Sequence, residues 1–385
     1  MQRGREVYLL PGHLSHSSKD AMSKLEAITQ KVLKNERLTE QESLALFVEG
    51  NLYDLGFLAN EIRWQKHPET VVTYVIDRNI NYTDICISAC KFCAFYKAPD
   101  DAEGSVISFA ELQKKIDETQ ELRGTQILLQ GGLHPDKQLE FYEDMLRFIK
   151  KTGIHIHGFS PPEICHFARI SGLSAADVIE RLRLAGLDSI PGGGAEILCD
   201  RVRQLAAPRK CSADEWIDVM RQAHMQGMKT TATMMFGHIE TVEERLEHLL
   251  RVRDLQDATG GFTAFIPWPF QPDNTAYSDI AKATPHTYLK MLAWSRIILD
   301  NVPNIQASWV TQGPKIAQIS LFFGANDFGS TMIEENVVAA AGVSFRLSEA
   351  EIRSLIKGAG FVPQQRTMDY SSVETDQDQQ RQNPD

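Results

Sequence analysis

The sequence predicts an α/β fold: a (β/α)8 barrel of the TIM type, with a helical extension before it and a short extension after it. Short apolar segments rich in β-branched and aromatic residues alternate with amphipathic segments, which is the pattern of a parallel sheet covered by helices. The length of 385 residues suits one large barrel with additions. The expected strands lie at 71–76, 125–132, 154–160, 186–190, 229–237, 261–268, 305–310 and 319–324. A partial barrel of six strands, without the last two segments, is the alternative.

The first part of the chain, residues 1–70, predicts helices and carries no catalytic signature. Apolar residues recur every three or four positions within 18–35, as they do on one face of a helix. Thr39 and Glu42 have the spacing of a capping box and predict the start of a second helix. Segment 52–67 predicts a third helix, so we expect an N-terminal helical extension.

The predicted barrel spans residues 71–335. Its first strand, "VVTYVI" at 71–76, is β-branched and aromatic, as expected of a buried strand. Several segments between strands open with Ser or Thr and close at Gly, for example 174–186 and 212–227, which is typical of capped helices. Strand and helix therefore alternate along most of this region.

Two segments follow the predicted barrel. Residues 336–368 predict a helix at 347–360 and a short strand at 361–367. Residues 369–385 predict a disordered tail, because the sequence from Ser371 onward is polar and has no aromatic residues.

Composition excludes several classes of protein. Hydrophobic residues make up 43% and charged residues 24%, which are ordinary values for a globular protein. The formal net charge of −11 argues against nucleic acid and anionic membranes as partners, because both attract clustered Lys and Arg. No apolar run approaches the roughly 20 residues of a membrane-spanning helix, and the N-terminus has no apolar stretch of signal-peptide length. We therefore expect a cytoplasmic protein whose six cysteines remain thiols.

Three of the six cysteines are grouped: Cys86, Cys90 and Cys93 are separated by three residues and then by two. Thiolates hold iron–sulfur clusters, usually four to a cluster. Three protein ligands would leave one iron open, and an open coordination position on a metal is a site for chemistry. The remaining cysteines are scattered and are interpreted as small buried hydrophobic residues: Cys165, Cys199 and Cys211.

Two other interpretations of the grouped cysteines stay open. A structural zinc site would need a fourth ligand, for which His134, His155 or His157 are candidates. A disulfide is less expected in a reducing compartment. The position of the motif, directly after a predicted barrel strand, favours an active site, because active sites of these barrels lie at the C-terminal ends of the strands.

The spacing CxxxCxxC after the first barrel strand, with aromatic Phe92 before the last cysteine, resembles the radical S-adenosylmethionine (SAM) enzymes. The resemblance implies that Cys86, Cys90 and Cys93 hold a [4Fe–4S] cluster. It also implies that S-adenosylmethionine chelates the fourth iron and is cleaved to methionine and a 5′-deoxyadenosyl radical, which takes a hydrogen atom from the substrate. The missing fourth thiolate would then leave room for this cofactor.

Glycine-rich segments follow the second and fourth predicted strands. Gly131 and Gly132 allow a ligand to approach the backbone closely. The family has Gly-Gly-Glu here, and this chain has Gly-Gly-Leu, so the resemblance implies that backbone carbonyls and Gln130 contact the methionine end of the cofactor. In "PGGGAE", Glu196 resembles the acidic residue that holds the ribose hydroxyls of the adenosyl group. A phosphate loop is a weaker interpretation, because no Gly-Lys-Ser/Thr follows.

Other loops after predicted strands supply further candidates. Gly237 and Glu240, in "FGHIE", lie where the family often contacts adenine. Two prolines fix the loop that carries Glu163, so this carboxylate is a candidate acid or base. Asp273 follows an aromatic segment, "FIPWPFQPD", and is a second candidate base.

Segments from "NINYTDIC" to "FFGANDFGSTMIEENV" together resemble the cyclic dehypoxanthinyl futalosine synthases of the futalosine route to menaquinone. The resemblance implies that the substrate is dehypoxanthine futalosine, whose ribose C4′ radical adds to the benzoate ring, and that loss of an electron and a proton restores aromaticity. The base would be Glu163, Asp273 or a histidine. The electron donor would be of the flavodoxin or ferredoxin type.

Alternatives remain within and outside this family. Aminofutalosine synthases and the radical components of deazaflavin (FO) synthase share the same ancestry. A cluster-carrying electron-transfer protein would need a fourth grouped cysteine. A metal-dependent hydrolase on the same fold would need histidines and aspartates at several strand ends, and "HIH" at 155–157 is the one hint of such a site.

Overall fold

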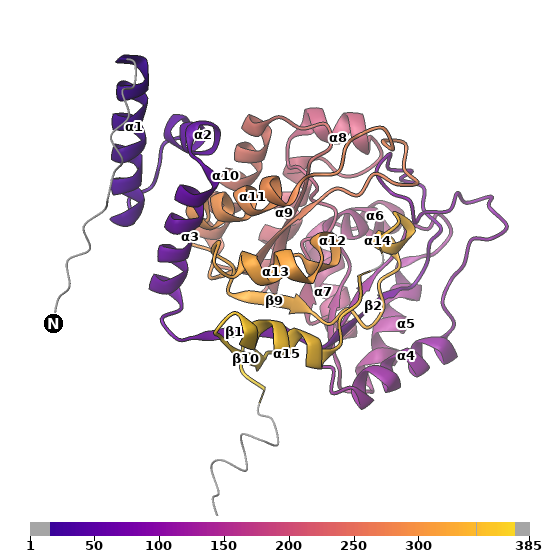
Figure 1. The fold of residues 1–385 in the computed structure, drawn as a ribbon. Coiled ribbons are helices and arrows are strands. Elements are labelled where there is room, and N and C mark those ends of the chain that lie inside the picture. The colour runs from indigo at the N-terminus through magenta and orange to yellow at the C-terminus, as the bar shows by residue number, and fades with distance from the viewer. Residues whose placement is uncertain (1–15, 344, 374–385) are drawn as a thin grey trace, which may run out of the picture.

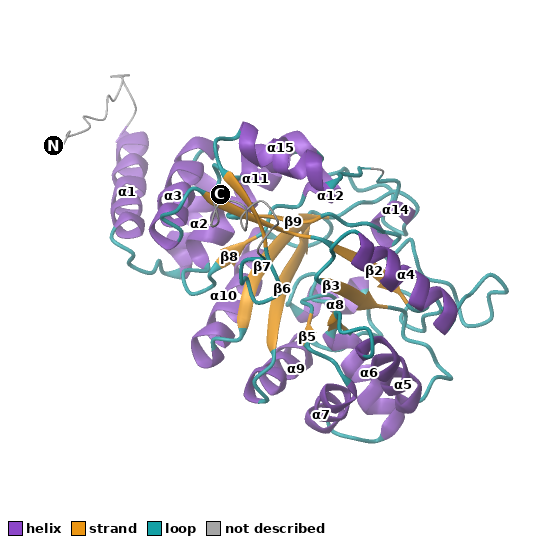
Figure 2. Cartoon of the chain, turned by 90° about the horizontal axis from the view of Figure 1, so that it is seen from below, coloured by secondary structure: helices purple, strands orange, loops and turns teal. Residues whose placement is uncertain are grey.

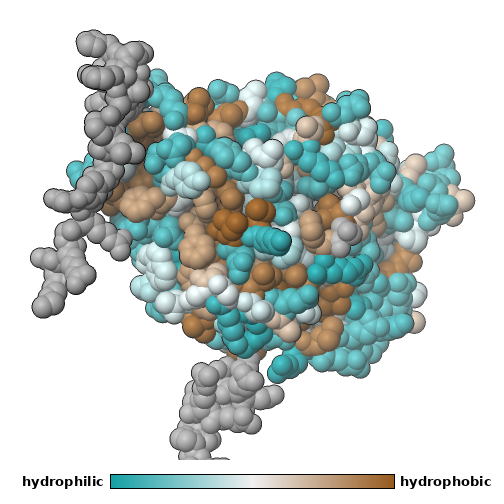
Figure 3. Space-filling model, viewed as in Figure 1, coloured by the Kyte–Doolittle hydropathy of each residue, from teal (hydrophilic) through white to brown (hydrophobic). Residues whose placement is uncertain are grey.

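The computed structural model describes residues 16–343 and 345–373. Helices form a shell around a curved parallel sheet, with the N-terminal helices standing to one side (Figures 1 and 2). Within the described residues, no helix is long and apolar enough to cross a membrane. On the face seen in Figure 1, hydrophobic side chains are mixed with hydrophilic ones and gather near the middle of the view (Figure 3).

The N-terminal extension docks on the barrel through buried aromatic residues. It contains α1 His16–Leu33, α2 Glu40–Glu49 and α3 Leu52–Lys66, and α3 packs on α11 Pro285–Ile298. The capping box predicted at Thr39 and Glu42 starts α2. The rings of Phe47 and Trp294 lie 4.4 Å apart, and Trp294 Nε1 donates to the Ser43 carbonyl at 3.1 Å. Burial of these groups fixes the extension on α11.

The central sheet has seven parallel strands in the order β2-β3-β4-β5-β6-β7-β8. Its strands are β2 Asp77–Asn81, β3 Gln126–Gln130, β4 His155–Gly158, β5 Ser189–Ile190, β6 Lys229–Phe236, β7 Phe262–Pro269 and β8 Asn304–Ile305. The helices between them are α4 Phe109–Glu121, α5 Leu139–Lys150, α6 Pro161–Ser171, α7 Ala175–Ala185, α8 Asp200–Ala206, α9 Ala213–Met225 and α10 Val242–Thr259. This alternation confirms the predicted TIM-type barrel class, and the six-strand alternative is wrong.

The prediction of the first barrel strand was wrong. Segment 71–76 forms β1 Val71–Val75, which belongs to a separate sheet of order β10-β1-β9. The first strand of the barrel is β2, "DRNIN", whose polar residues Asp77, Arg78 and Asn79 are buried. Polar residues disfavour a strand assignment from sequence. They are tolerated here because two of them, Asp77 and Asn79, line an internal cavity.

The prediction of an eighth strand at 319–324 was also wrong, because this apolar run continues from helix α13 Pro314–Ser320 into a turn. Segment 305–310 is a strand only at its start, and α12 Trp309–Gln312 follows. A short apolar run does not by itself distinguish a strand from a buried helix.

The gap between β8 and β2 is bridged by β9 Asp327–Ser330 and the residues beside it. Asn326 N donates to the Ile305 carbonyl at 3.1 Å, and Ala307 N donates to the Asp327 carbonyl at 2.9 Å. On the other side, Ile333 N donates to the Asp77 carbonyl at 3.1 Å. This segment therefore occupies the eighth position of the barrel wall.

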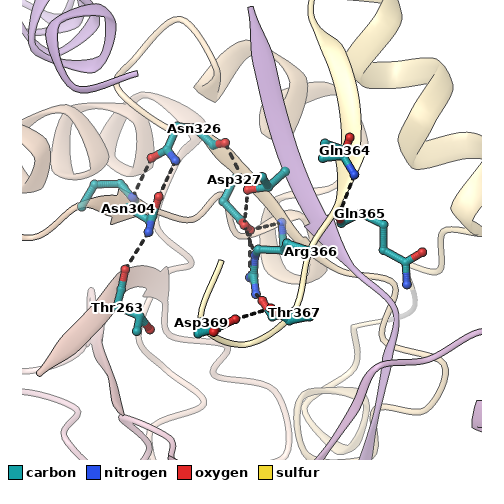
Figure 4. Close-up of polar contacts among 12 residues, drawn as sticks. Thr263, Asn304, Asn326, Asp327, Gln364, Gln365, Arg366, Thr367 and Asp369 are labelled. Atoms are coloured by element: carbon teal, nitrogen blue, oxygen red, sulfur yellow. Dashed lines mark hydrogen bonds and ion pairs between the residues drawn. The ribbon is translucent and has the colours of Figure 1, made fainter. Parts of the chain in front are cut away.

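The C-terminal region crosses the N-terminal ends of the barrel strands. After α14 Val337–Ala340, the predicted helix and strand are present as α15 Glu349–Gly358 and β10 Val362–Gln365. Arg366 N then donates to the Tyr74 carbonyl at 2.9 Å, and Thr125, just before β3, donates through Oγ1 to the Arg366 carbonyl at 3.4 Å. Figure 4 shows Arg366 facing Asp327 of β9. Residues 374–385 of the predicted tail lie outside the described residues.

Candidate active site

The grouped cysteines lie on the loop that leaves the C-terminal end of β2 and together line one cavity of about 250 Å3, which we call the thiol cavity. Two backbone hydrogen bonds fix the loop: Cys86 N to the Lys97 carbonyl at 2.9 Å and Ile87 N to the Leu133 carbonyl at 3.0 Å. The Cys86 sulfur accepts from Leu133 N at 3.3 Å. Bonds of this kind stabilise a thiolate.

A buried cation stands beside these thiols. Burial raises the pKa of Cys90 to about 11 and also raises the pKa of Cys93. Lys210 lines the same cavity, with its Nζ 2.9 Å from Glu196 Oε1. Burial alone would lower the pKa of Lys210, but Cys90 and Glu196 outweigh it and raise that pKa. A fixed positive charge here favours a negatively charged group bound to the thiolates.

The histidines proposed as a fourth zinc ligand lie elsewhere. His134, His155 and His157 do not line the thiol cavity; His155 and His157 instead contact Ser189, and His134 Nδ1 accepts from Asp136 N at 3.1 Å. In the described part of the chain, no three Cys, His, Asp or Glu side chains converge closely enough to hold a single ion. Thiolates that bind separate iron atoms of one cluster do not have to converge in this way.

The two glycines after β3 leave no room for side chains. A Cβ on Gly131 would lie 2.6 Å from the Tyr82 ring, and one on Gly132 would lie 2.2 Å from the Ile85 carbonyl oxygen. Both glycines line the thiol cavity. Only glycine lets the backbone run this close to the cysteine loop, which leaves backbone groups at the cavity surface.

The buried carboxylate of Glu163 fixes the same turn through hydrogen bonds. Its Oε1 accepts from Tyr82 OH at 2.6 Å and from Gly131 N at 3.1 Å, while its Oε2 accepts from Ser160 N at 2.7 Å. Burial raises the pKa of Glu163, and the donors around it act in the opposite direction. Glu163 lines the thiol cavity, but its oxygens are occupied by the protein's own donors.

A second cavity of about 280 Å3 occupies the interior of the barrel, and we call it the barrel cavity. It adjoins the thiol cavity, and Gln130, Glu196 and Trp268 line both. Glu196 has a left-handed backbone, with φ of 41°, which fixes where its carboxylate enters the junction. Two of the predicted cofactor-binding residues, Gln130 and Glu196, therefore lie where two ligands would meet.

The barrel cavity is polar at the end that lies near the N-terminal ends of the strands. Arg366 and Tyr370 reach it from the C-terminal segment, and His157 reaches it from β4. Arg366 is 5% exposed and pairs with Asp327. Among the described residues that line this cavity, Arg366 is the one lysine or arginine.

The other predicted site residues lie outside both cavities. Glu240 is buried and accepts from Gly237 N at 2.6 Å and from Arg245 Nη2 at 2.7 Å, so it fixes the turn after β6. Burial would raise the pKa of Glu240, but His238, Arg245 and the backbone donors lower it. The side chain of Asp273 is 48% exposed and pairs with Lys282 at 2.7 Å.

Among the residues that line these cavities, sequence reasoning did not identify Lys210 or Arg366, and it did not place His157 in a cavity. Lys210 and Arg366 carry no local motif, because each reaches its cavity through the fold. The "HIH" segment was a signal for His157, since residues two apart on a strand point to the same face.

Two family models match the chain: "Radical SAM superfamily" over residues 80–252 and "CofH/MqnC C-terminal region" over residues 259–379. A cyclic dehypoxanthine futalosine synthase of Halalkalibacterium halodurans is 46% identical over 92% of this chain and 97% of its own length. The chain belongs to the radical SAM superfamily.

Of two further relatives, one carries the same name and the other is named for a different reaction. A cyclic dehypoxanthine futalosine synthase of Streptomyces coelicolor is 45% identical over 91% of this chain and 89% of its own length. A 5-amino-6-(D-ribitylamino)uracil–L-tyrosine 4-hydroxyphenyl transferase of Methanosarcina barkeri is 43% identical over 87% of this chain and 90% of its own length. Sequence similarity alone therefore does not decide between the two reactions named for these relatives.

Solved structures share the fold. The hydrogenase maturase HydG of Carboxydothermus hydrogenoformans has a TM-score of 0.73 at 18% identity, covering 91% of this chain and 82% of its own. Methylornithine synthase (PylB) has a TM-score of 0.68 at 17% identity, covering 87% of this chain and 97% of its own. At these identities the likeness concerns the fold alone.

Enzymes of this superfamily use a [4Fe–4S] cluster and S-adenosylmethionine, and the thiol cavity fits both. Three thiols supply the donor set of a cluster with one open iron. Gly131 and Gly132 leave backbone accessible beside them, and Lys210 supplies a compensating charge. The protein is therefore a radical SAM enzyme, and the thiol cavity at the C-terminal ends of the barrel strands is its candidate cofactor site.

Proposed function

We propose that this enzyme converts dehypoxanthine futalosine to its cyclic form in menaquinone biosynthesis. The observation that carries the proposal is the barrel cavity, which adjoins the thiol cavity and is lined at one end by Trp268 and at the other by Arg366. The relatives at 46% and 45% identity carry this activity in their names. A nucleoside-derived substrate with one carboxylate matches an aromatic, polar chamber with one cationic residue.

The cofactors would be held by residues at the junction of the cavities. Cys86, Cys90 and Cys93 would hold the cluster, and bound S-adenosylmethionine supplies the radical chemistry. Gln130 and the backbone at Gly131 and Gly132 would contact the methionine end, and Glu196 would bind the ribose hydroxyls. Gly237 and Glu240, which line neither cavity, would act by shaping the turn after β6.

The substrate would lie along the barrel axis, with its benzoate toward the N-terminal ends of the strands. Arg366 would face the carboxylate, because a guanidinium is the side chain best suited to carboxylate recognition. Trp268 would separate the reacting carbon from water at the junction. Exclusion of water matters here because a carbon radical must react with the ring before it meets another hydrogen donor.

Glu163 and Asp273 are less suited to act as the base than their sequence context indicated. Glu163 already accepts hydrogen bonds from Tyr82, Gly131 and Ser160. Asp273 lies outside both cavities. We infer that Glu163 positions the turn after β3 and that a different residue receives the substrate's proton.

A hydroxyphenyl transfer like that named for the archaeal relatives is the second candidate function, since those proteins are 43% identical to this chain. Aminofutalosine synthesis is a third. We propose a flavodoxin- or ferredoxin-type electron donor and a cytoplasmic location, where reduced thiols are maintained.

The test is anaerobic incubation of reconstituted enzyme with S-adenosylmethionine, a reductant and dehypoxanthine futalosine deuterated at ribose C4′. The expected product has lost two hydrogens relative to the substrate, and deuterium is expected in 5′-deoxyadenosine. Parallel reactions contain either 5-amino-6-ribitylaminouracil with tyrosine or an enolpyruvyl benzoate. Turnover of one of these instead would assign the enzyme to that reaction and reject the cyclase proposal.

A further inference from the structure

Two histidines and one serine form a continuous hydrogen-bonded chain at the barrel cavity. Ser189 of β5 pairs in register with His157 of β4. The Ser189 Oγ lies 2.7 Å from His157 Nδ1 and 2.7 Å from His155 Nε2. One hydroxyl therefore links two imidazole rings.

The two ends of this chain face different surroundings. His157 is 6% exposed and lines the barrel cavity, where Arg366 is the nearby charge that acts on it besides His155. His155 is half-buried, near Asp188 from the loop before β5, Lys150 of α5 and Asp369 of the C-terminal segment. Lys150 pairs with Asp188 at 2.6 Å. The chain thus leads from the closed cavity toward carboxylates at the N-terminal ends of the strands.

The chemistry of the three groups allows a directed arrangement. A serine hydroxyl has one proton, so it donates to one ring and accepts from the other. If His157 Nδ1–H donates to Ser189 and Ser189 donates to His155 Nε2, then His157 Nε2 is an unprotonated acceptor available to a ligand in the cavity. The other imidazole nitrogen is fixed by the serine, so this tautomer is held in place.

Charge favours movement of a proton outward along the chain. Burial, with added contributions from His155 and Arg366, lowers the pKa of His157 to about 3. The pKa of His155 is also lowered, mainly by burial and in part by Lys150, while the carboxylates of Asp188 and Asp369 oppose this shift. A proton received at His157 is therefore more stable after transfer to His155.

We propose that His157 is the base of the ring-closing reaction and that Ser189 and His155 carry the proton away from the cavity. The inference rests on the proposed function. When the cyclised ring regains aromaticity, its C–H bond breaks and the proton goes to His157 Nε2. The Nδ1 proton of His157 moves to Ser189, and the Ser189 proton moves to His155 Nε2. The remaining electron would go to a one-electron oxidant, for which an oxidised iron–sulfur cluster held by the three cysteines would serve.

The experiment compares Ser189→Ala with Ser295→Ala, which removes a different buried hydroxyl. Ser295 lies in α11, bonds to the Met291 carbonyl at 2.8 Å and lines neither cavity. The readout is cyclised product formed per 5′-deoxyadenosine, with deuterium transfer from C4′ measured in the same samples. For Ser189→Ala we expect at least a fivefold fall in this ratio with deuterium transfer retained, and for Ser295→Ala we expect the wild-type ratio.

A wild-type ratio in Ser189→Ala would overturn the relay while leaving the proposed function intact. Failure of the wild type to form any cyclised product would instead reject the proposed function. If Ser189→Ala does not fold, Ser189→Thr keeps the hydroxyl and is expected to keep the ratio, and His155→Gln is expected to lower it.

A second measurement needs no catalysis. Nitrogen NMR of histidine-labelled, cofactor-free protein reports which ring nitrogen carries the proton. The proposal requires the Nδ1–H tautomer at His157 at neutral pH. An Nε2–H tautomer at His157, or a doubly protonated ring, would overturn the assignment of this residue as the base.

Discussion

Lys210 and Glu196 place opposite charges at the boundary between the thiol cavity and the barrel cavity. Their side chains are 14% and 11% exposed, and Arg203 Nη1 lies 3.7 Å from Glu196 Oε2. Glu196 is thus held by two cations, and it is still positioned to accept hydrogen bonds from ligand hydroxyls. The charge of Lys210 faces Cys90, where it would offset the negative charge of a thiolate-bound cluster.

Substitution of Lys210 by Met should therefore make the bound cluster harder to reduce. Reduction adds negative charge, which a nearby ammonium stabilises. We expect a more negative midpoint potential in an EPR-monitored titration, with iron content close to wild type. Lys282→Met, which removes a surface cation paired with Asp273, serves as the control and should leave the potential unchanged. An unchanged potential in Lys210→Met would show that its charge does not act on the cluster.

The grouped cysteines should contribute to iron binding, and the scattered cysteines should not. Changing Cys86, Cys90 or Cys93 to Ala removes one of three donors, so we expect loss of cluster absorbance and of S-adenosylmethionine cleavage. Cys199→Ala is the control, because Cys199 is buried, as Cys90 is, but donates to Glu244 at 3.3 Å outside the thiol cavity. Iron content measured after anaerobic reconstitution decides the assignment, and full iron content in Cys90→Ala would contradict it.

At the scale of elements, helices and strands were predictable from the sequence where the spacing of apolar residues matches the residues that the fold buries. Helices with amphipathic faces and caps, such as α2, α7 and α9, were predictable, and so was the strand β6. β2 was not, because its buried residues are polar and serve a cavity that the sequence does not reveal. β9, "DFGS", is short and owes its strand conformation to hydrogen bonds with segments about 20 and 250 residues away. Pairing over such separations has no local signal.

The same reasoning applies to the site. The cysteines, the two glycines after β3 and Glu196 were predictable because each belongs to a local motif. Arg366 and Lys210 were not, since only the folded chain places them beside the cavities. Loops after strands attracted the candidates Asp273 and Glu240, but position after a strand does not determine whether a side chain turns inward.

Helix α10 positions the loop that carries Glu196. His248 of α10 is fully buried, and its Nδ1 accepts from Leu198 N at 3.0 Å. Burial lowers the pKa of His248 to about 3, below the value near 6.5 expected in the unfolded chain. Between these two values the unfolded chain binds the proton and the folded protein does not. Stability from this group is therefore complete above pH 6.5 and is lost as the pH falls toward 3.

His248→Asn should weaken this pH dependence, because an amide oxygen can accept from Leu198 N without titrating. We expect the free energy of unfolding to change with pH less steeply than in the wild type between pH 6 and pH 4, by up to about 1.4 kcal/mol per pH unit. Urea unfolding at several pH values measures the slope. If the free energy of unfolding of the variant changes with pH as steeply as that of the wild type, His248 is not held neutral in the folded protein. His157 and His224, whose pKa values are lowered to about 3 and 4, account for the pH dependence that remains in the variant.

At the scale of the whole molecule, segments from before and after the central sheet in the chain lie side by side in one small sheet. β1, from the beginning of the barrel region, lies between β10 and β9, which both come from its end. Thr73 Oγ1 donates to Asp327 Oδ2 at 2.6 Å, and Arg366 bonds to the same carboxylate. Figure 4 shows this contact beside Asn326 and Asn304, which join β9 to β8. Closure of the barrel and the cationic end of its cavity thus depend on one buried ion pair.

Substitution of Arg366 by Gln should therefore affect both stability and substrate binding. Removing one partner leaves the Asp327 carboxylate buried without its cation, which typically costs about 3–5 kcal/mol of folding free energy. The control Asp214→Asn breaks a surface pair with Arg251 and should cost about 1 kcal/mol or less.

The double variant Arg366→Gln/Asp327→Asn removes both charges, so it should recover part of the stability lost in Arg366→Gln. It should not recover affinity for the carboxylate-bearing substrate, because the cation facing the cavity is still absent. Urea unfolding and calorimetric binding of dehypoxanthine futalosine separate the two effects, and wild-type affinity in the double variant would show that Arg366 closes the barrel without contacting substrate.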